Sequence, residues 1–468
     1  MKYFVALLSA VLLITGCTVG PKYKRPAVTV PGSYRGAVPE QAGQPQITPS
    51  ITSLGNQKWW DIFQDEQLRT LIRIALQQNY DVRIAASRVL EARAQVGITR
   101  ADQFPTLSAG AAIGDNRTAQ SSFLPPLETS TGQLNASAIW ELDFWGKFRR
   151  ATEAARANLL ANEWAHQEVV STLVANVASA YFQLRALDLQ LEISKRTLAS
   201  RKESLRLTQV LADGGATSLL DVRQAEQLVF TASAEVPALE QQIEQQGNFL
   251  SILLGQNPSD VPRGRPLTEQ HQPPEVPPGL PSELLERRPD VRQAEEQLIA
   301  ANAQIGVARA AYFPDISLSG ASGFQSSALS NLVTGPAGAW NFGGSLTQPI
   351  FTGGRLRSGV RLAEAREQTA LLVYQQSIQA AFRNVSDGLV AYRKTHEFRQ
   401  QEELLFQSAQ DAARLSRLRY TGGVTGYLEV LTNETNAFSA ELALVQARQN
   451  ELLALVQLYQ ALGGGWQQ

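Results

Sequence analysis

Two long stretches without proline constrain this chain more than any other feature. They run from about residue 148 to 212 and from about 356 to 420. In the first, leucines recur at the spacing of one face of a helix: Leu184, Leu187, Leu191, Leu198 and Leu205. About 65 residues at ~1.5 Å each make a rod of about 95 Å. Such a rod is stable in water only when it packs against partners, as in a coiled coil.

Each rod ends in a glycine-rich decapeptide, and the two decapeptides are similar. The first is "DGGATSLLDV" (213–222) and the second is "TGGVTGYLEV" (421–430). A glycine just past a helix can adopt the left-handed conformation that ends it, and Thr217 or Ser218 can cap the helix that follows. Asp221 and its counterpart Glu429 then lie in the positive first turn of that helix. We therefore interpret both decapeptides as tips of helical hairpins.

A phosphate-binding loop is the alternative interpretation of these glycines. It requires a preceding strand and usually a following lysine, and neither is present. The returning helices are predicted at 218–254 and 426–462, and Pro237 is expected to kink the first of them.

The rest of the sequence is duplicated as well. "DVRIAASRVLEARAQVGITRADQFP" (81–105) aligns without gaps to "DVRQAEEQLIAANAQIGVARAAYFP" (290–314), 209 positions later. "FWG" (144–146) is matched by "FTG" (351–353) at nearly the same spacing. A repeat of this length indicates two copies of one supersecondary unit.

Each half begins with a predicted helix, 66–103 or 283–312, which Phe-Pro ends. About 40 residues rich in Gly, Ser, Thr and Asn follow, with alternating polarity typical of two strands joined by a polar loop (115–130 and 326–337). The strand segments are "TLSAGAAIG", "LNASAIWELDFW", "ISLSGASGF" and "AWNFGGSLTQPIF". Their aromatic residues suit a girdle at a membrane interface: Trp140, Phe144, Trp145, Trp340 and Phe342. The alternative is a small soluble β-subdomain.

Four strands are too few to close a barrel in a membrane, where single-chain barrels begin at about eight strands. An open edge leaves backbone groups unpaired in hydrocarbon. Two copies give eight strands with a filled interior, and three give twelve with a usable bore. We expect three copies, and hence a fold of long α-helices in a coiled-coil tunnel with four β-strands per chain that complete a twelve-stranded barrel.

The first residues, "MKYFVALLSAVLLITGC", have the form of a secretory signal that ends in a lipobox. We expect a signal peptide at 1–16 and a lipid on Cys17, the only cysteine of the chain. The alternative is an ordinary signal with a chance cysteine. Thr18, rather than Asp, favours sorting to the outer membrane.

Composition argues against several other functions. Lys and Arg number 42 against 43 Asp and Glu, so no basic surplus indicates nucleic acid. Three scattered histidines, His166, His271 and His396, form no metal-ligand pattern and no catalytic triad. We expect no enzyme activity, no metal site and no cofactor other than the lipid on Cys17. After the signal, no apolar stretch of about 18 residues predicts a transmembrane helix.

Taken together, the motifs resemble the TolC-like outer membrane factors, in the lipidated branch called NodT- or OprM-like. The matching segments are the lipobox at Cys17, "GPKYKRP" (20–26), "WW" (59–60), "WELDFWGKFRR" (140–150), "QPIFTGGRLR" (348–357) and the two Gly-Gly tips. They span essentially the whole mature chain. The resemblance implies a homotrimer anchored in the bacterial outer membrane and extending into the periplasm. It also implies a passive exit channel of a tripartite efflux pump for drugs and other amphiphiles, with a periplasmic adaptor protein and an inner-membrane RND-type transporter as partners.

The resemblance also assigns roles to residues at the tips. Asp221, Leu428 and Glu429 are expected to form the periplasmic aperture, although Thr432 stands where the family usually has aspartate. The expected adaptor-docking residues are Gly214, Gly215, Thr217, Gly422, Gly423 and Thr425. For Asp221 and Glu429 the alternative is a plain helix cap on a solvated surface, and for the docking residues it is preservation of the turn alone.

The predicted organisation is a lipid-anchored irregular segment (17–65), a first repeat (66–255), a Pro-rich linker (256–282), a second repeat (283–462) and a tail (463–468). Alternative functions are an exit channel for type I protein secretion or for metal efflux, and a structural coiled-coil lipoprotein of the envelope.

Overall fold

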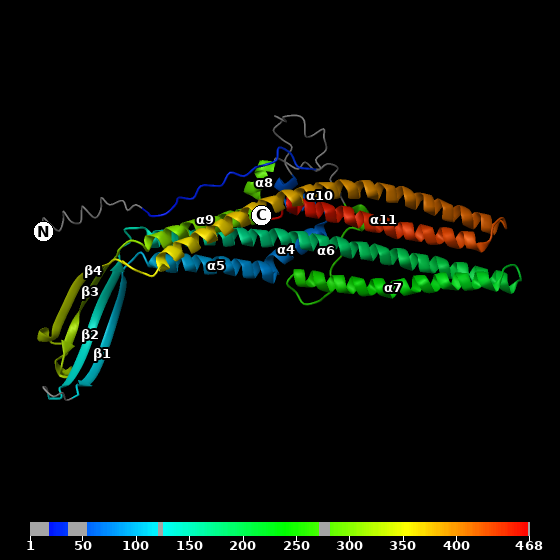
Figure 1. Ribbon diagram of the computed structural model, residues 1–468. Coiled ribbons are helices and arrows are strands. Elements are labelled where there is room, and N and C mark those ends of the chain that lie inside the picture. The colour runs from blue at the N-terminus through cyan, green and yellow to red at the C-terminus, as the bar shows by residue number, and fades with distance from the viewer. Residues whose placement is uncertain (1–17, 36–53, 120–124, 271–280, 467–468) are drawn as a thin grey trace. The chain divides into compact units, whose positions relative to one another are not determined.

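The computed structural model describes residues 18–35, 54–119, 125–270 and 281–466 (Figure 1). These residues fall into two compact units. The first is built from 1–27, 88–163 and 293–375, and the second from 28–87, 164–292 and 376–468, as far as they are described. Each unit therefore takes chain from both halves of the sequence. The predicted signal peptide and Cys17 lie outside the described residues.

The predicted duplication is present in the order and the lengths of the elements. The first half contains α4 (Glu66–Gln78), α5 (Tyr80–Ala101), β1 (Thr106–Arg117), β2 (Glu128–Glu141), α6 (Lys147–Asp213) and α7 (Leu219–Leu253). The second contains α8 (Pro281–Arg287), α9 (Pro289–Ala310), β3 (Asp315–Ser326), β4 (Gly338–Thr347), α10 (Arg355–Thr421) and α11 (Tyr427–Ala461). Helices α5 and α9 have 22 residues each, α6 and α10 have 67, and α7 and α11 have 35.

The prediction of one unbroken helix at the start of each half was wrong, because each is two helices. In the first half Asn79 interrupts the helix, and its Oδ1 accepts hydrogen bonds from the backbone N–H of Asp81 (2.8 Å) and Val82 (3.2 Å). In the second half Pro289 is the first residue of α9. Both residues suit the start of a helix, Asn as a cap and Pro because it has no N–H to leave unpaired.

The four predicted strands form one antiparallel sheet in the first unit, in the order β1-β2-β3-β4. Strands β1 and β2 extend further into the predicted 115–130 loop than the sequence indicated, and an ion pair joins Arg117 to Glu128 at their far end (3.3 Å). The predicted 326–337 loop contains two single turns of 3₁₀-helix, η3 (Leu329–Asn331) and η4 (Gly335–Ala337).

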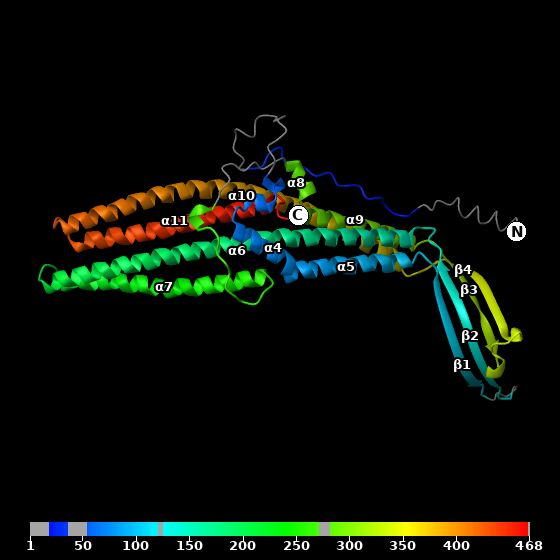
Figure 2. The ribbon, with the colours of Figure 1, turned by 180° about the vertical axis from the view of Figure 1, so that it is seen from behind.

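In the second unit, the rods and the returning helices form two hairpins. In Figures 1 and 2, α6 lies beside α7 and α10 lies beside α11. Helix α6 buries Val170, Val174, Val177, Tyr181 and Leu184 at three- and four-residue spacing. Of the leucines from which the sequence predicts a seam, only Leu184 is buried, and the others are half-buried. Helix α7 continues through Pro237 without interruption.

The segment before α4 is less irregular than predicted. It contains η1 (Leu54–Asn56) and α3 (Trp59–Ile62), and it ends at the buried Asp65, which caps α4 through the backbone N–H of Gln67 and Leu68. The other oxygen of Asp65 accepts hydrogen bonds from Tyr181 of α6 (2.7 Å) and from Arg265 N (2.9 Å) of the linker. One buried carboxylate thereby ties three parts of the chain together.

Among the helices that the structure describes, none has a run of apolar residues long enough to span a bilayer.

Candidate functional site

The first hairpin tip is a helix end, a tight turn and a capped helix start. Gly215 has a positive φ of 74°, and the backbone N–H of Ala216 bonds to the carbonyl of Leu211 (2.8 Å). The N–H of Gly215 bonds to Ala212 O (3.0 Å). These two bonds make a Schellman motif, in which a residue without Cβ occupies the left-handed position at no steric cost. The predicted glycine stop is thereby confirmed.

The start of α7 is capped as the sequence indicated. Ser218 is the N-cap, its hydroxyl accepts from Asp221 N (3.3 Å), and the Asp221 carboxylate accepts from Ser218 N (3.2 Å). This reciprocal pair is a capping box. The Thr217 hydroxyl also donates to Asp221, and this hydrogen bond holds the pKa of the Asp221 carboxyl below its ordinary value. Its stabilising contribution is therefore present at neutral pH and is lost only as the pH falls through that lowered pKa.

The second tip repeats the turn but caps the helix differently. Gly423 has a φ of 72°, and Val424 N bonds to Arg419 O (2.9 Å). The N-cap of α11 is Gly426, which has no side chain to accept a hydrogen bond. Glu429 compensates by accepting from the Thr425 hydroxyl and by pairing with Arg419 (3.0 Å).

The structure therefore places Asp221 and Glu429 at equivalent positions, each turned back onto its own tip. Leu428, the residue before Glu429, is exposed, and so is its counterpart Leu220, the residue before Asp221. Thr432 bonds back to the Leu428 carbonyl within α11 (2.9 Å). Asp221 thus caps its helix, whereas Glu429 contacts the Thr425 hydroxyl and Arg419 and makes no capping bond to the backbone. Both acidic side chains are partly exposed.

Sequence reasoning missed two residues of the second tip, Arg419 and Tyr427. Arg419 offsets the charge of Glu429, whereas the first tip has Leu211 at the equivalent position. Tyr427 is buried with Ala225 of α7 and Val430 of α11, and its ring meets Tyr420 edge-on at 5.4 Å between centroids. At both positions the two halves of the sequence carry different residues. This difference is the signal from which the sequence could have identified them.

Further along the helices from the tips, polar side chains join the two hairpins. Arg196 of α6 pairs with Glu441 of α11. Arg417 of α10 pairs with Glu434 inside its own hairpin and also donates to Ser200 Oγ of α6 (3.4 Å). Arg201 of α6 is buried, lies over the Phe438 ring of α11 (5.0 Å to the centroid) and donates to Leu228 O of α7 (3.1 Å). Burial lowers the pKa of Arg201. These contacts link both hairpins of one chain into a single bundle.

The strand sheet has one apolar and one polar face. Residues that pair across strands lie on the same face, so the register groups Leu107, Ile113, Leu134, Leu318, Phe324, Phe342 and Leu346 on one side. The opposite side carries Asn135, Gln133, Gln325, Asn341 and two hydroxyl pairs, Ser108–Ser137 and Ser317–Ser345 (2.8 Å each). One face suits hydrocarbon and the other suits water.

The predicted aromatic residues divide into two groups. Trp140, Trp340 and Phe342 lie on the apolar face and are exposed in the single chain. Trp145, by contrast, stacks on Phe313 (4.7 Å between centroids) and donates to Pro314 O (2.9 Å). Its ring packs at the end of the sheet and is half-buried there.

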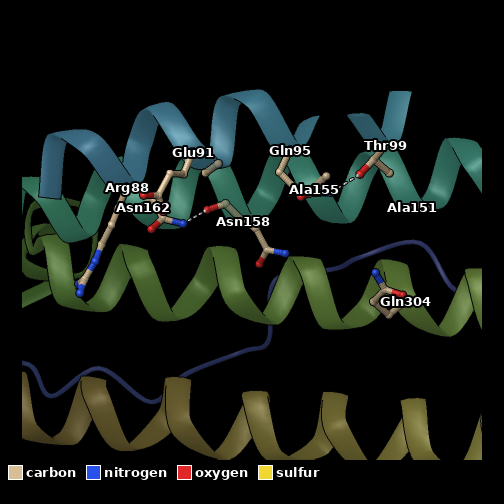
Figure 3. A pocket seen from close by; sticks show the side chains of 10 residues that line it. Arg88, Glu91, Gln95, Thr99, Ala151, Ala155, Asn158, Asn162 and Gln304 are labelled. Carbon is tan, nitrogen blue, oxygen red and sulfur yellow. Dashed lines mark hydrogen bonds between the residues drawn. The ribbon is translucent and has the colours of Figure 1, made fainter. Parts of the chain in front are cut away.

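A polar groove of about 620 Å³ lies among α5, α6 and α9 in the first unit. Figure 3 shows Arg88 and Glu91 of α5 on one side of it, with Asn158 and Asn162 of α6 opposite and Gln304 of α9 nearby. Its polar lining suits water and passing solutes. In the part of the chain that the structure describes, no group of three or more His, Cys, Asp or Glu side chains could hold a metal ion.

The residues after Cys17 are held firmly on the first unit. In this N-terminal strap (residues 18–27), Val19 N donates to Trp145 O (3.0 Å) and Arg25 pairs with Glu295 of α9 (3.0 Å). Gly20, with a φ of 111°, packs on Gly306, and a Cβ at Gly20 would lie 2.5 Å from Gly306 Cα. The attachment of the strap begins beside Gly146, where the sheet ends and α6 starts.

The family model described as "Outer membrane efflux protein" matches this chain twice, over residues 71–256 and 280–464. The solvent efflux pump outer membrane protein SrpC of Pseudomonas putida is 38% identical over 473 residues, covering 100% of this chain and 99% of that protein. The cation efflux system protein CusC of Escherichia coli O6:H1 is 36% identical, covering 98% and 97%. Among solved structures, the open state of the Neisseria gonorrhoeae MtrE outer membrane channel is 33% identical with a TM-score of 0.87, covering 96% and 99%.

Proposed function

This chain belongs to the outer membrane efflux protein family and is the outer membrane channel of an efflux pump, and we propose that three copies of it form one continuous exit duct. In this arrangement the sheets close into a twelve-stranded barrel and the helices form a tunnel through the periplasm. The duct is passive and catalyses no reaction. An inner-membrane RND-type transporter supplies the energy.

The open sheet with its two unlike faces carries this proposal. Within the described chain, β1 pairs only with β2 and β4 only with β3, so both outer strands present unpaired N–H and C=O groups. Hydrocarbon does not tolerate such edges, and closure into a barrel removes them. Because the apolar side chains share one face and the polar side chains the other, the closed sheet has an outer surface for lipid and a wet interior.

We assign adaptor docking to the two hairpin tips. The turn residues Gly214, Gly215, Thr217, Gly422, Gly423 and Thr425 fix the shape of both tips, and exposed apolar side chains lie beside them, including Leu219, Leu220, Val424 and Leu428. An exposed apolar patch on a rigid turn is a suitable surface for a partner protein. The partner is a periplasmic adaptor that joins the duct to the transporter.

We place the periplasmic aperture at Asp221, Leu428 and Glu429. Three copies bring six carboxylates from these positions to the end of the tunnel, and rings of acidic side chains favour cations over anions. The role of Asp221 in capping α7 is compatible with this arrangement, because a capping carboxylate keeps its charge.

We propose a lipid anchor on Cys17. The strap supports it, because it fixes Thr18 at the junction between the sheet and α6, where the barrel wall meets the periplasm. Two or three acyl chains there suffice for stable attachment. The lipid is the only covalent group that the proposal requires.

The proposed cargo is drugs and other amphiphiles, in line with the solvent efflux function that names SrpC. CusC, which is named for cation efflux, makes metal ions the second candidate. Susceptibility of a deletion strain separates the two. Loss of resistance to detergents, dyes and solvents supports amphiphiles, whereas loss of tolerance to metal cations alone supports cations. A secretion defect alone supports type I protein export.

The duct itself is tested by reconstituting the purified protein into planar bilayers and measuring its native mass in detergent. We expect a stable trimer that conducts. A monomer that is folded but gives no conductance contradicts the proposal and favours a structural coiled-coil lipoprotein.

A further inference from the structure

The loop between β3 and β4 (residues 327–337, the β3–β4 loop) is folded onto one side of the sheet. Leu329 begins η3, and Leu332 is the residue that follows this turn. A Cβ on Gly132 of β2 would lie 3.3 Å from Leu329 Cδ2 and 3.7 Å from Leu332 Cδ1. Gly132 pairs with Ile113 of β1, so this Cβ would point to the apolar face. The loop therefore covers the apolar face at the level of Ile113.

The β3–β4 loop presents apolar side chains to its surroundings. Leu329 is 61% exposed and Val333 is 71% exposed in the single chain. In the sequence, no Asp, Glu, Lys or Arg occurs between Asp315 and Arg355, a stretch that holds the rest of β3, the loop and all of β4. An exposed apolar patch that continues an apolar sheet face marks a surface that meets hydrocarbon or a partner protein.

The opposite ends of β1 and β2 have a charged character instead. Arg117 of β1 pairs with Glu128 of β2 at 3.3 Å. Asp115 and Arg117 follow Ile113 on the same face of β1, about 7 and about 13 Å further along the strand. Charged side chains on the lipid side of a barrel are costly within the hydrocarbon, so these residues mark the level at which water begins. The folded loop lies on the hydrocarbon side of that level.

The height of the apolar face supports the same placement. On β3 this face runs from Ile316 at one end to Ser326, the partner of Gly132, at the other. Ten residues separate Ile316 from Ser326, which is about 33 Å along a strand. For strands tilted by about 40° this corresponds to about 25 Å across a membrane, the usual height of the apolar band of an outer-membrane barrel. The loop therefore covers the last rows of the band and not the region beyond it.

The backbone of the β3–β4 loop also satisfies polar groups within the loop. The N–H of Asn331 bonds to Ala328 O (3.1 Å), and the N–H of Ala337 bonds to Thr334 O (3.0 Å). The Thr334 hydroxyl donates to Asn331 O (2.7 Å). Backbone groups that enter an apolar environment need such internal partners. The two 3₁₀ turns thus suit a loop that is partly removed from water.

Building on the duct proposed above, we infer that the β3–β4 loop is embedded in the outer leaflet of the membrane and not in the water above it. Leu329 and Val333 contact lipid acyl chains just below the headgroups. The partner is lipid hydrocarbon, because the apolar surface of the loop continues the lipid-facing side of the sheet and the loop has no Lys or Arg to bind a headgroup phosphate. Each copy of the chain adds one apolar shoulder to the outer rim of the barrel.

Fluorescent labels on single cysteines test this placement. In a Cys17→Ser background, Leu329→Cys and Val333→Cys are made separately and labelled with the fluorophore NBD. Leu107→Cys is the lipid control, since Leu107 is on the apolar face and 77% exposed. Glu128→Cys, at the charged end of β2, is the water control. The purified trimers are reconstituted into phosphatidylcholine vesicles that contain a lipid with a nitroxide quencher near the top of its acyl chain.

We expect the nitroxide lipid to lower the fluorescence of the labels at Leu329 and Val333 as strongly as that of the label at Leu107. Aqueous iodide, added to a second sample, should quench the label at Glu128 and leave the other three bright. Two separate test positions are used so that one of them remains if the other substitution prevents insertion.

The inference is overturned if iodide quenches both test labels as strongly as the label at Glu128, because the loop is then in water. It is also overturned if neither quencher reaches them, because the loop is then covered by another part of the protein. Both results leave the duct intact when the labelled protein has the mass of a trimer and conducts. A folded monomer that does not conduct overturns the duct itself.

Discussion

At the level of single residues, the two acidic side chains of the tips are held in different ways. Asp221 is fixed by the hydroxyls of Thr217 and Ser218, whereas Glu429 is shared between Thr425 and the guanidinium of Arg419. The negative charge of Glu429 is therefore offset by the positive charge of Arg419, whereas the carboxylate of Asp221 is held by neutral hydroxyl groups. A substitution at position 429 should change the electrostatics of the aperture while leaving the turn in place.

We predict that Glu429→Ala raises single-channel conductance in planar bilayers, because it removes three carboxylates and the Arg419–Glu429 pair from the constriction. Thr432→Ala, one turn further along α11, is the control, since its hydroxyl only bonds back to Leu428 O. Unchanged conductance in Glu429→Ala removes this residue from the aperture.

A second residue-level feature is the buried Glu451 of α11. Its two oxygens meet Nδ1 of His396 (2.5 Å) and Nε of Arg399 (2.6 Å), both on α10. Shifted by 208 positions, Glu451 and Arg399 correspond to Ile243 and Leu191 of the first hairpin. The same hairpin design thus works with apolar residues at these two positions, so the buried charge is not required by the fold.

We predict that Glu451→Gln lowers stability by about 3 kcal/mol, because it removes an ionic partner from the largely buried Arg399 guanidinium and leaves Glu403 to balance its charge. The double variant Glu451→Ile with Arg399→Leu, which copies the first hairpin, should recover most of that loss. Thermal unfolding of both variants checks this. Equal losses in the single and the double variant would show that the charges themselves are needed.

At the level of elements, the hairpin tips show why a glycine pair recurs. The two glycines of each pair are not equivalent: Gly215 and Gly423 have positive φ, whereas Gly214 and Gly422 remain in the helical turn. Only the second glycine of each pair is required by backbone conformation. The backbone conformation of the first glycine is open to other residues.

We predict that Gly215→Val and Gly423→Val each cost at least about 1–2 kcal/mol through left-handed strain, and that they abolish efflux by misplacing the tip. Gly214→Ala separates the turn from the docking role, since its new Cβ makes only ordinary contacts within the chain, the nearest being Val210 O at 3.5 Å, and leaves the turn intact. Drug susceptibility is measured beside the amount of trimer in the outer membrane. If Gly214→Ala also loses efflux while the trimer level is normal, this position contacts the adaptor directly.

At the level of the whole molecule, two features place the barrel in the membrane: the apolar face of the sheet and the strap that leads from Cys17. The strap makes several independent contacts, including Arg25–Glu295 and Gly20 on Gly306. It therefore stays in place without the lipid. We therefore propose that a lipid on Cys17 adds affinity for the bilayer and is not needed to build the pore.

We predict that Cys17→Ser lowers the amount of trimer in the outer membrane but leaves the conductance of each assembled channel unchanged. Quantitative blotting of membrane fractions measures the first quantity, and single-channel recording of the purified protein measures the second. Altered unit conductance in Cys17→Ser would show that the anchor shapes the pore.

The sequence by itself determined the elements and their repetition, because helix periodicity, strand alternation and glycine stops are local properties of the chain. Thus the 67-residue helices, the four strands and both tips could be predicted, and the cap of α7 was narrowed to Thr217 or Ser218. The helix interruptions at Asn79 and Pro289 are also predictable from local sequence, because Asn and Pro both favour the start of a new helix.

Only the tertiary structure decided which side chains meet across elements. The stacking of Trp145 on Phe313 and the burial of Glu451 depend on packing between elements distant in sequence. The pairing of Arg419 with Glu429 depends on how the tip brings α10 and α11 together. Packing between distant elements also buries four alanines between α6 and α9, namely Ala154, Ala157, Ala300 and Ala303. Periodicity shows that a face is apolar, but the partner of that face is fixed by how the elements pack in three dimensions.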